Sequence, residues 1–162
     1  MPRIMDRRHF LGGVTSGAVA LALWQFWPER AEAAYPFALS DAEWKKRLSP
    51  WAYKVLRNQA TEFPGSSPFN AEHRAGIFTC AGCEQKLFSS KTKYDSGTGW
   101  PSFWAALPKA VGTSRDVGLG EIRVEVHCAR CGGHLGHVFD DGPRPTGKRY
   151  CMNGVAMRFS PA

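Results

Sequence analysis

Two Cys-x-x-Cys pairs, at positions 80–83 and 128–131, restrict the folds that are open to this chain of 162 residues. Four thiolates in two such pairs have the spacing that tetrahedral Zn²⁺ ligation uses, and a site closed by four cysteines is structural because no coordination position remains for a substrate. The pairs are separated by 44 residues, so the metal would tie two distant β-hairpins together. We predict one structural Zn²⁺ per chain, held by Cys80, Cys83, Cys128 and Cys131.

Two redox-active dithiols or two disulfides are the alternative interpretation of the same four cysteines. The duplication of the motif, the strand-like run before each pair and the absence of a thioredoxin-like βαβ pattern favour zinc. His127 stands directly before Cys128 and could compete as a ligand, but four cysteines already complete a tetrahedral site.

The fifth cysteine, Cys151, belongs to neither pair and lies in the sequence Arg-Tyr-Cys-Met-Asn. If the other four bind a metal, Cys151 is the thiol left for chemistry. His134 and His137 stand three residues apart in a glycine-rich segment, and two histidines near a lone cysteine are typical of acid–base support for a thiolate. Structural histidines that bond loop carbonyls would have the same pattern, so the residues alone leave both interpretations open.

A segment rich in glycine and aromatic residues, positions 95–104, is the other unusual feature. It contains Trp100, Phe103 and Trp104. Aromatic side chains beside glycines could line a pocket for a small apolar group, or they could belong to the core, which is the commoner location of such residues.

Residues 1–33 have the pattern of a twin-arginine export signal. Arg7 and Arg8 precede an apolar stretch over residues 10–27, and Ala31 and Ala33 supply small residues at the spacing of a cleavage site. We expect cleavage to leave a domain of residues 34–162 that reaches the periplasm already folded. A retained N-terminal membrane anchor is the alternative, because the stretch is about as long as a short membrane span.

The 129 residues that remain are enough for one domain with its own core. They carry 17 Lys and Arg against 11 Asp and Glu, which is a net charge of +6. These basic residues are dispersed and form no run interleaved with aromatic residues, so we expect no nucleic-acid partner.

Capping signals predict two short helices at the start of this domain. Ser40 and Glu43 have the spacing of a capping box, which predicts a helix from residue 41. Ser49 before Pro50 predicts a second helix that ends near residue 58. The Pro, Gly and Ser residues that follow predict a loop.

After this loop the pattern changes to short strands and turns. We expect strands over residues 76–79, 121–127, 149–151 and 155–159, which makes the chain mainly β. The second of them alternates strictly, so we expect Ile122, Val124 and Val126 on a buried face and the residues between them on an exposed face.

Four segments together resemble the methionine-R-sulfoxide reductase B family: the first Cys-x-x-Cys pair, Ser-Gly-Thr-Gly-Trp-Pro-Ser-Phe at 96–103, Cys-x-x-Cys-Gly-Gly-His-Leu-Gly-His-Val-Phe at 128–139, and Arg-Tyr-Cys-Met-Asn at 149–153. Residues 44–57 are similar to the N-terminal part of that family, so the resemblance covers nearly all of residues 34–162. It implies two antiparallel sheets with short N-terminal helices, and Cys151 on a strand beside a loop that carries His134 and His137. It also implies reduction of the R epimer of methionine sulfoxide in oxidised proteins, a repair reaction.

The resemblance also implies a role for each candidate site residue. Cys151 resembles the nucleophile that attacks the sulfoxide sulfur, and His134 and His137 resemble the histidines that protonate the departing oxygen. Asn153 resembles a residue that helps to hold the reacting group, and Trp100 resembles the wall against which the ε-methyl group packs. The reaction needs both a thiolate and an acid, because a sulfoxide sulfur is electrophilic only when its oxygen is protonated or strongly hydrogen-bonded.

The chain departs from the family at two positions. Many relatives have a second cysteine where this chain has Thr98, so we expect a one-cysteine enzyme whose Cys151 sulfenic acid is reduced by an external thiol or a thioredoxin-like protein. In the periplasm this implies a thiol carrier fed across the inner membrane. Gly154 stands where the family often has serine, which would loosen the site slightly. Arg149 either keeps Cys151 ionised or is structural.

A zinc-containing binding module that keeps the fold without the chemistry is the rival function. The presence of Cys151, His137 and Asn153 together weighs against it. We expect the enzyme to act as a monomer on proteins that carry methionine sulfoxide.

Overall fold

A computed structural model describes residues 35–162 of the chain. The twin-arginine signal predicted over residues 1–33 lies outside the described residues and stays a prediction. Within residues 35–162, no helix has both the length and the apolar character that crossing a membrane requires.

Two short helices open the described part of the chain, as the capping signals predict. α1 (Asp41–Arg47) begins after Ser40, whose hydroxyl accepts from the backbone N–H of Glu43 while the Glu43 carboxylate accepts from the backbone N–H of Ser40. α2 (Pro50–Asn58) begins after Ser49, with proline at its first position. Caps of this kind satisfy donors that the first turn leaves unpaired, so both helix starts are encoded locally.

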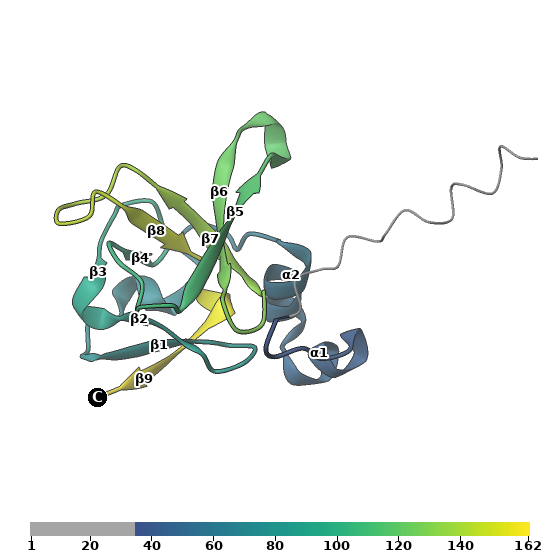
Figure 1. The fold of residues 1–162 in the computed structure, drawn as a ribbon. Helices are drawn as coiled ribbons and strands as arrows, with labels where there is room; N and C mark the ends of the chain where they lie inside the picture. Colours follow the sequence, from purple (N-terminus) through teal and green to yellow (C-terminus); the bar gives the residue numbers. More distant parts are fainter. Residues whose placement is uncertain (1–34) are drawn as a thin grey trace, which may run out of the picture. The chain divides into compact units, whose positions relative to one another are not determined.

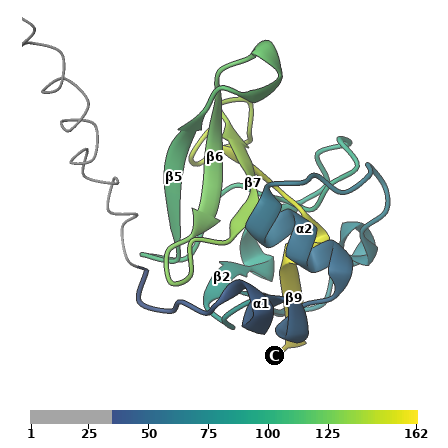
Figure 2. The same cartoon turned by 90° about the vertical axis from the view of Figure 1, so that its right-hand side faces the viewer.

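In residues 35–162, nine strands form two antiparallel sheets (Figure 1, Figure 2). The smaller sheet has the order β2-β1-β9, and the larger has the order β3-β4-β8-β7-β6-β5. The strands are β1 (Gly76–Cys80), β2 (Lys86–Ser89), β3 (Lys93–Tyr94), β4 (Ser102–Phe103), β5 (Val111–Asp116), β6 (Arg123–Cys128), β7 (His134–Phe139), β8 (Arg149–Met152) and β9 (Met157–Pro161). The prediction of a mainly β domain with two antiparallel sheets and short N-terminal helices is confirmed.

The core of the domain contains large apolar side chains from both sheets. Phe78 of β1, Phe88 of β2 and Phe103 of β4 are fully buried, and the rings of Phe88 and Phe103 stack with their centroids 4.4 Å apart. Burying such a ring contributes about 1.5 to 3 kcal/mol. The aromatic segment 95–104 therefore gives one of its three aromatic side chains, Phe103, to the core.

The strand predicted to begin at Glu121 starts later, and its apolar face is buried only at one end. β6 begins at Arg123, and the side chains of Ile122 and Val124 are 68% and 44% exposed, whereas Val126 is fully buried. The β5–β6 hairpin projects away from the rest of the domain (Figure 1), so its outer half has no second layer to pack against. Alternation along a strand defines two faces, but it does not say how far either face is covered.

Two further expectations about local structure are wrong. Val155 and Ala156 belong to a short 3₁₀ turn, η5 (Gly154–Ala156), and the last strand begins after them. His134 and His137 lie on β7 and not in a loop. The glycines beside them favour a turn locally, but pairing of β7 with both β6 and β8 overrides that preference.

Candidate active site and metal centre

The four paired cysteines meet in one buried cluster. Their Sγ atoms all lie within 4.8 Å of one another, with 3.7 Å between Cys80 and Cys131 and 3.5 Å between Cys83 and Cys128. These distances are far longer than the roughly 2.05 Å of a disulfide. They are close to the edge of about 3.8 Å in a tetrahedron with zinc–sulfur bonds of about 2.3 Å. The donor set fits a tetrahedral metal ion, and His127 is not a member of it.

Each Cys-x-x-Cys pair lies on a turn of the same design. The backbone N–H of Glu84 donates to the carbonyl of Cys80, and that of Gly132 donates to the carbonyl of Cys128, both at 2.9 Å. Glu84 and Gly132 both have left-handed backbone dihedrals, with φ of 65° and 67°, which folds each turn back on itself. Cys80 ends β1 of the smaller sheet and Cys128 ends β6 of the larger, so a metal here ties the two sheets together.

Strand register places the lone thiol in a row of polar residues across the larger sheet. Ser102, Cys151, His137, Glu125 and Ser114 are paired one after the other across β4, β8, β7, β6 and β5. Directly paired residues on neighbouring strands share one face of a sheet. The thiol of Cys151 and the imidazole of His137 are therefore neighbours although they stand on different strands.

A pocket with a volume of about 120 Å³ opens beside Cys151. Its lining comprises Thr61, Trp100, Arg123, Gly136, His137, Phe139, Cys151 and Asn153. Four of the five predicted site residues are thus brought together around one cavity. The fifth, His134, is not in the lining, but its ring lies against that of His137 with the centroids 5.4 Å apart.

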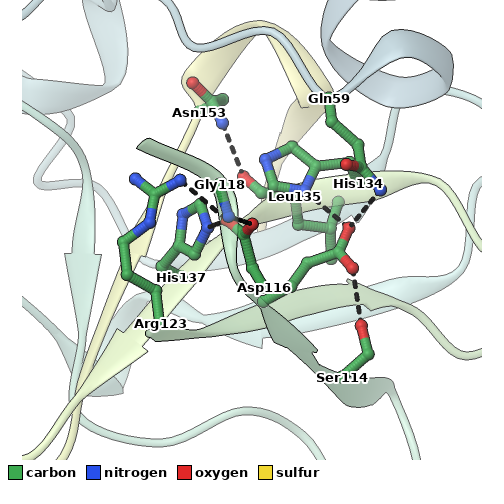
Figure 3. A network of polar contacts seen from close by, with 10 residues as sticks. Gln59, Ser114, Asp116, Gly118, Arg123, His134, Leu135, His137 and Asn153 are labelled. Atoms are coloured by element: carbon green, nitrogen blue, oxygen red, sulfur yellow. Dashed lines mark hydrogen bonds and ion pairs between the residues drawn. The ribbon is translucent and has the colours of Figure 1, made fainter. Parts of the chain in front are cut away.

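Each of the two histidines forms a hydrogen bond with a carboxylate from the β5–β6 hairpin (Figure 3). Nδ1 of His134 lies 2.7 Å from Oε1 of Glu125, and Nε2 of His137 lies 2.7 Å from Oδ2 of Asp116. Both partners are carboxylates, whereas purely structural histidines were expected to bond loop carbonyls. Burial lowers the pKa of His137, and the hydrogen bond with Asp116 opposes this without cancelling it.

Cys151 is partly buried, and this burial raises the pKa of its thiol. Two neighbours oppose the shift without cancelling it: Thr98, whose Oγ1 lies 3.8 Å from Sγ, and the guanidinium of Arg149. Arg149 donates two hydrogen bonds to the carboxylate of Asp141, at 2.8 and 2.7 Å. Arg149 is therefore held in an ion pair and also favours the thiolate, which combines the two interpretations that the sequence left open.

Glu62, which no sequence pattern singled out, links two walls of the pocket. Its backbone carbonyl accepts from the indole N–H of Trp100 at 3.1 Å, and its backbone N–H donates to Oδ1 of Asn153 at 2.9 Å. Its buried carboxylate accepts from the backbone N–H groups of Gly154 at 2.5 Å and Val155 at 3.1 Å. One residue thus holds the aromatic wall, the amide and the turn that follows β8.

Gly154 has no space for a side chain in this arrangement. A Cβ at this position would lie 1.8 Å from Oγ of Ser67 and 3.3 Å from Oε1 of Glu62. The hydroxyl of Ser67 occupies the space beside the turn, so the absence of a side chain at position 154 leaves no gap there.

Replacing Glu62 with glutamine is expected to destabilise the domain by about 1 to 3 kcal/mol, the cost of leaving one buried donor unpaired. The carboxylate accepts from two backbone N–H groups, and a glutamine amide can offer only one acceptor oxygen to them. Thermal unfolding followed by circular dichroism should show a melting temperature several degrees lower. Glu121→Gln, a change at an exposed side chain, is the matched control. Equal melting temperatures for the two variants would contradict the contacts assigned to Glu62.

Three residues of the site were not predicted from the sequence: Glu62, Asp116 and Arg123. Asp116 and Arg123 are paired across β5 and β6 near the tip of the hairpin. The alternation in β6 did mark Arg123 and Glu125 as one polar face. It could not indicate that this face turns toward a pocket, because residues that line the rest of the pocket, such as Trp100 and Cys151, are distant in sequence.

Comparisons with known proteins agree with the family resemblance of the sequence motifs. A family model described as the SelR domain matches residues 48–161. A protein of Bradyrhizobium diazoefficiens is 54% identical over 123 residues, which cover 75% of this chain and 88% of the relative. One of Leifsonia xyli subsp. xyli is 50% identical over 135 residues, with coverages of 82% and 97%, and one of Methanosarcina barkeri is 52% identical over 121 residues, with coverages of 74% and 85%. All three carry the name peptide methionine sulfoxide reductase MsrB. With the SelR match spanning most of its length, the chain belongs to the SelR-domain family, in which these MsrB reductases are its relatives.

Proposed function

We propose that this chain is an enzyme that reduces the R epimer of methionine sulfoxide in oxidised proteins to methionine. The observation that carries the proposal is the shared pocket of Cys151, His137 and Trp100, which offers a nucleophile, an acid and an aromatic wall. The names of the relatives support the same reaction class.

The proposed reaction moves one oxygen atom from the substrate to Cys151. The Cys151 thiolate forms an S–S bond with the sulfur of the protonated sulfoxide. The hydroxyl group then moves from that sulfur to Sγ of Cys151 as the S–O and S–S bonds break, which leaves methionine and a sulfenic acid. The substrate gains two electrons and becomes a thioether, while Cys151 loses two electrons. The proton that activates the oxygen comes from His137 and remains on the sulfenic acid. The ring of His134 lies against that of His137.

Epimer selectivity follows from the position of Trp100 on the pocket wall. If the indole ring packs against the ε-methyl group, the sulfoxide can place its oxygen toward His137 in one epimer only. In the other epimer the oxygen and the lone pair exchange places, so the oxygen points away from the acid. Asn153 helps to hold the reacting group as part of the same wall, where its amide is fixed by Glu62 and by the carbonyl of Leu135.

A racemic methionine sulfoxide peptide tests the proposal directly. The purified full-length protein is incubated with the peptide and dithiothreitol, and the two epimers are followed separately by chiral chromatography. We expect the R epimer to disappear and the S epimer to remain. Consumption of neither epimer by folded, metal-loaded protein would reject the reductase and favour the binding module. Consumption of both at similar rates would reject the role of Trp100.

We infer that the metal of the cysteine cluster is Zn²⁺, because a closed set of four thiolates is a typical structural zinc site. The ion would connect the two turns and leave the chemistry to Cys151. Metal analysis should find about one zinc per chain, and iron in its place would contradict the inference.

We also infer that the Cys151 sulfenic acid is reduced by an external thiol. The other four cysteines of the sequence are gathered in the metal cluster, and the side chain near Cys151 at position 98 is a threonine. A disulfide to Cys151 that forms reproducibly after one turnover would contradict this inference.

For location, we propose export to the periplasm by the twin-arginine route, which makes a periplasmic thiol carrier the reductant. The proposal rests on Arg7, Arg8 and the small residues near position 33. Cell fractionation should find a shortened chain in the periplasm, and none when both arginines are replaced by lysine. Full-length protein in the membrane fraction would support the retained anchor instead.

A further inference from the structure

A carboxylate at the tip of the β5–β6 hairpin reaches the pocket from outside its lining. Oδ2 of Asp116 lies 2.7 Å from Nε2 of His137 and 2.7 Å from Nη2 of Arg123. Oδ1 accepts from the backbone N–H of Gly118 at 2.8 Å (Figure 3). Asp116 and Arg123 are also register partners, so the hairpin itself fixes where the carboxylate stands.

This arrangement leaves the Asp116 carboxylate ionised and fixed in place. The backbone N–H of Gly118 and the side chain of His137 hold the pKa of Asp116 well below its usual range, and Arg123 adds to the effect. A fixed carboxylate bonded to one imidazole nitrogen orients the ring and stabilises the imidazolium, while the second nitrogen stays available for a substrate. Nε2 of His137 is engaged by Asp116, so Nδ1 is the atom left for proton transfer.

We propose that Asp116 is a positioning residue of the sulfoxide reduction, which holds His137 in its orientation and favours its imidazolium form as the proton is delivered. The inference rests on the proposed function, because it assigns His137 the role of the acid. With this role, the tip of the β5–β6 hairpin takes part in catalysis although it lies outside the core.

The charged and titratable groups around His137 come from four strands. β5 contributes Asp116, β6 contributes Arg123 and the register partner Glu125, β7 itself contributes His134, and the paired residue on β8 is Cys151. Arg123 and His134 lower the pKa of His137, as its burial does, and Asp116 is the neighbour that raises it. The carboxylate of Glu125 is committed to His134 at 2.7 Å and to Ser114 at 2.6 Å. Asp116 is therefore the neighbour whose charge favours the protonated form of His137.

Unused hydrogen-bonding capacity marks the same cluster. In residues 35–162, the buried side-chain nitrogen or oxygen atoms without a partner are Nε of Arg123 and Nε2 of His134. Both residues flank His137, and buried polar atoms are otherwise paired in almost every folded protein. The unpaired atoms therefore lie next to the histidine that Asp116 contacts, and Arg123 also lines the pocket.

The test measures the protonation of His137 directly in the full-length, zinc-loaded protein. Histidine ring nitrogens are labelled with ¹⁵N and titrated by NMR, and a His137→Gln variant identifies the resonance among the five histidines of the chain. In Asp116→Asn the pKa of His137 should fall by about 1, because a carboxylate at hydrogen-bond distance favours the charged ring. Arg123→Gln should move it upward, because a neighbouring positive charge is removed. Damage to the fold would not shift the two variants in opposite directions.

Kinetics supply the second readout. An imidazolium with a lower pKa loses its proton at lower pH, so the alkaline limb of the kcat/KM profile of Asp116→Asn should move to lower pH by the same amount. At pH 7 its kcat/KM for the R epimer should fall about tenfold or more. Asp140→Asn, which removes the same charge from an exposed side chain paired with Lys148, should change neither quantity.

An unchanged pKa of His137 in Asp116→Asn would overturn the positioning role. Failure of the wild-type protein to reduce either epimer would overturn the proposed function instead, and the NMR titration would still report whether Asp116 controls His137. The two failures are therefore distinguishable.

Discussion

A Cys151→Ser variant should retain the fold and the metal but lose reduction of the R epimer by about 10⁴-fold or more. The substitution changes one atom on β8, in the lining of the pocket, and leaves the register pairs of Cys151 with Ser102 and His137 intact. A serine hydroxyl is far less acidic than a thiol, and its oxygen cannot take up the oxygen of a sulfoxide as a sulfenic acid does. Initial rates measured by chiral chromatography at saturating dithiothreitol check this expectation.

A single turnover without reductant identifies the product on the enzyme. The wild type should release one methionine per chain and carry one dimedone-reactive sulfenic acid, which peptide mass spectrometry places on Cys151. The serine variant should release none. Activity within a hundredfold of the wild type in Cys151→Ser would show that another group is the nucleophile.

Loss of the metal should unfold the domain. In Cys128→Ser, or after prolonged chelation, cooperative melting should disappear from the temperature range in which the wild type melts. Structural Zn²⁺ sites of this type contribute on the order of 10 kcal/mol or more to the folded state, whereas a whole domain is stable by only about 5 to 15 kcal/mol. Without the ion, Cys80 and Cys128 no longer connect the smaller sheet to the larger, and four buried thiols face one another.

Cys151→Ser is the matched control for the metal prediction, because it makes the same substitution outside the cluster. Circular dichroism melts and metal analysis on both variants should show metal loss and unfolding for Cys128→Ser only. A metal-free protein that melts at the wild-type temperature would restore the alternative of two redox-active dithiols.

The sequence predicted best the features that depend on contacts within a few residues. The reciprocal bonds of Ser40 and Glu43, and the serine–proline start of α2, lie within one helical turn, and both helices begin where these signals place them. The Cys-x-x-Cys turns are equally local, since a bond between residues four apart forms each of them. The duplicated spacing and the strand-like run before each pair indicated that the two turns would share a metal.

Predictions failed where a face or a strand depends on contacts outside its own segment. Ile122 and Val124 alternate as a buried face should, but the hairpin extends beyond the layer that could cover them. His134 and His137 stand among glycines that favour a turn, yet two neighbouring strands pair with that segment and make it β7. A strand lacks internal hydrogen bonds of its own, so its identity is decided by its neighbours.

Residue identity and short spacing were enough to predict which thiol is outside the metal cluster, which residue types could support its chemistry, and how both helices start. The hydrogen bond between Asp116 and His137, and those of Glu62 with Trp100 and Asn153, became evident only in the folded chain. Those contacts join segments separated by some 20 to 90 positions, and their geometry follows from strand register and packing, which no short pattern encodes.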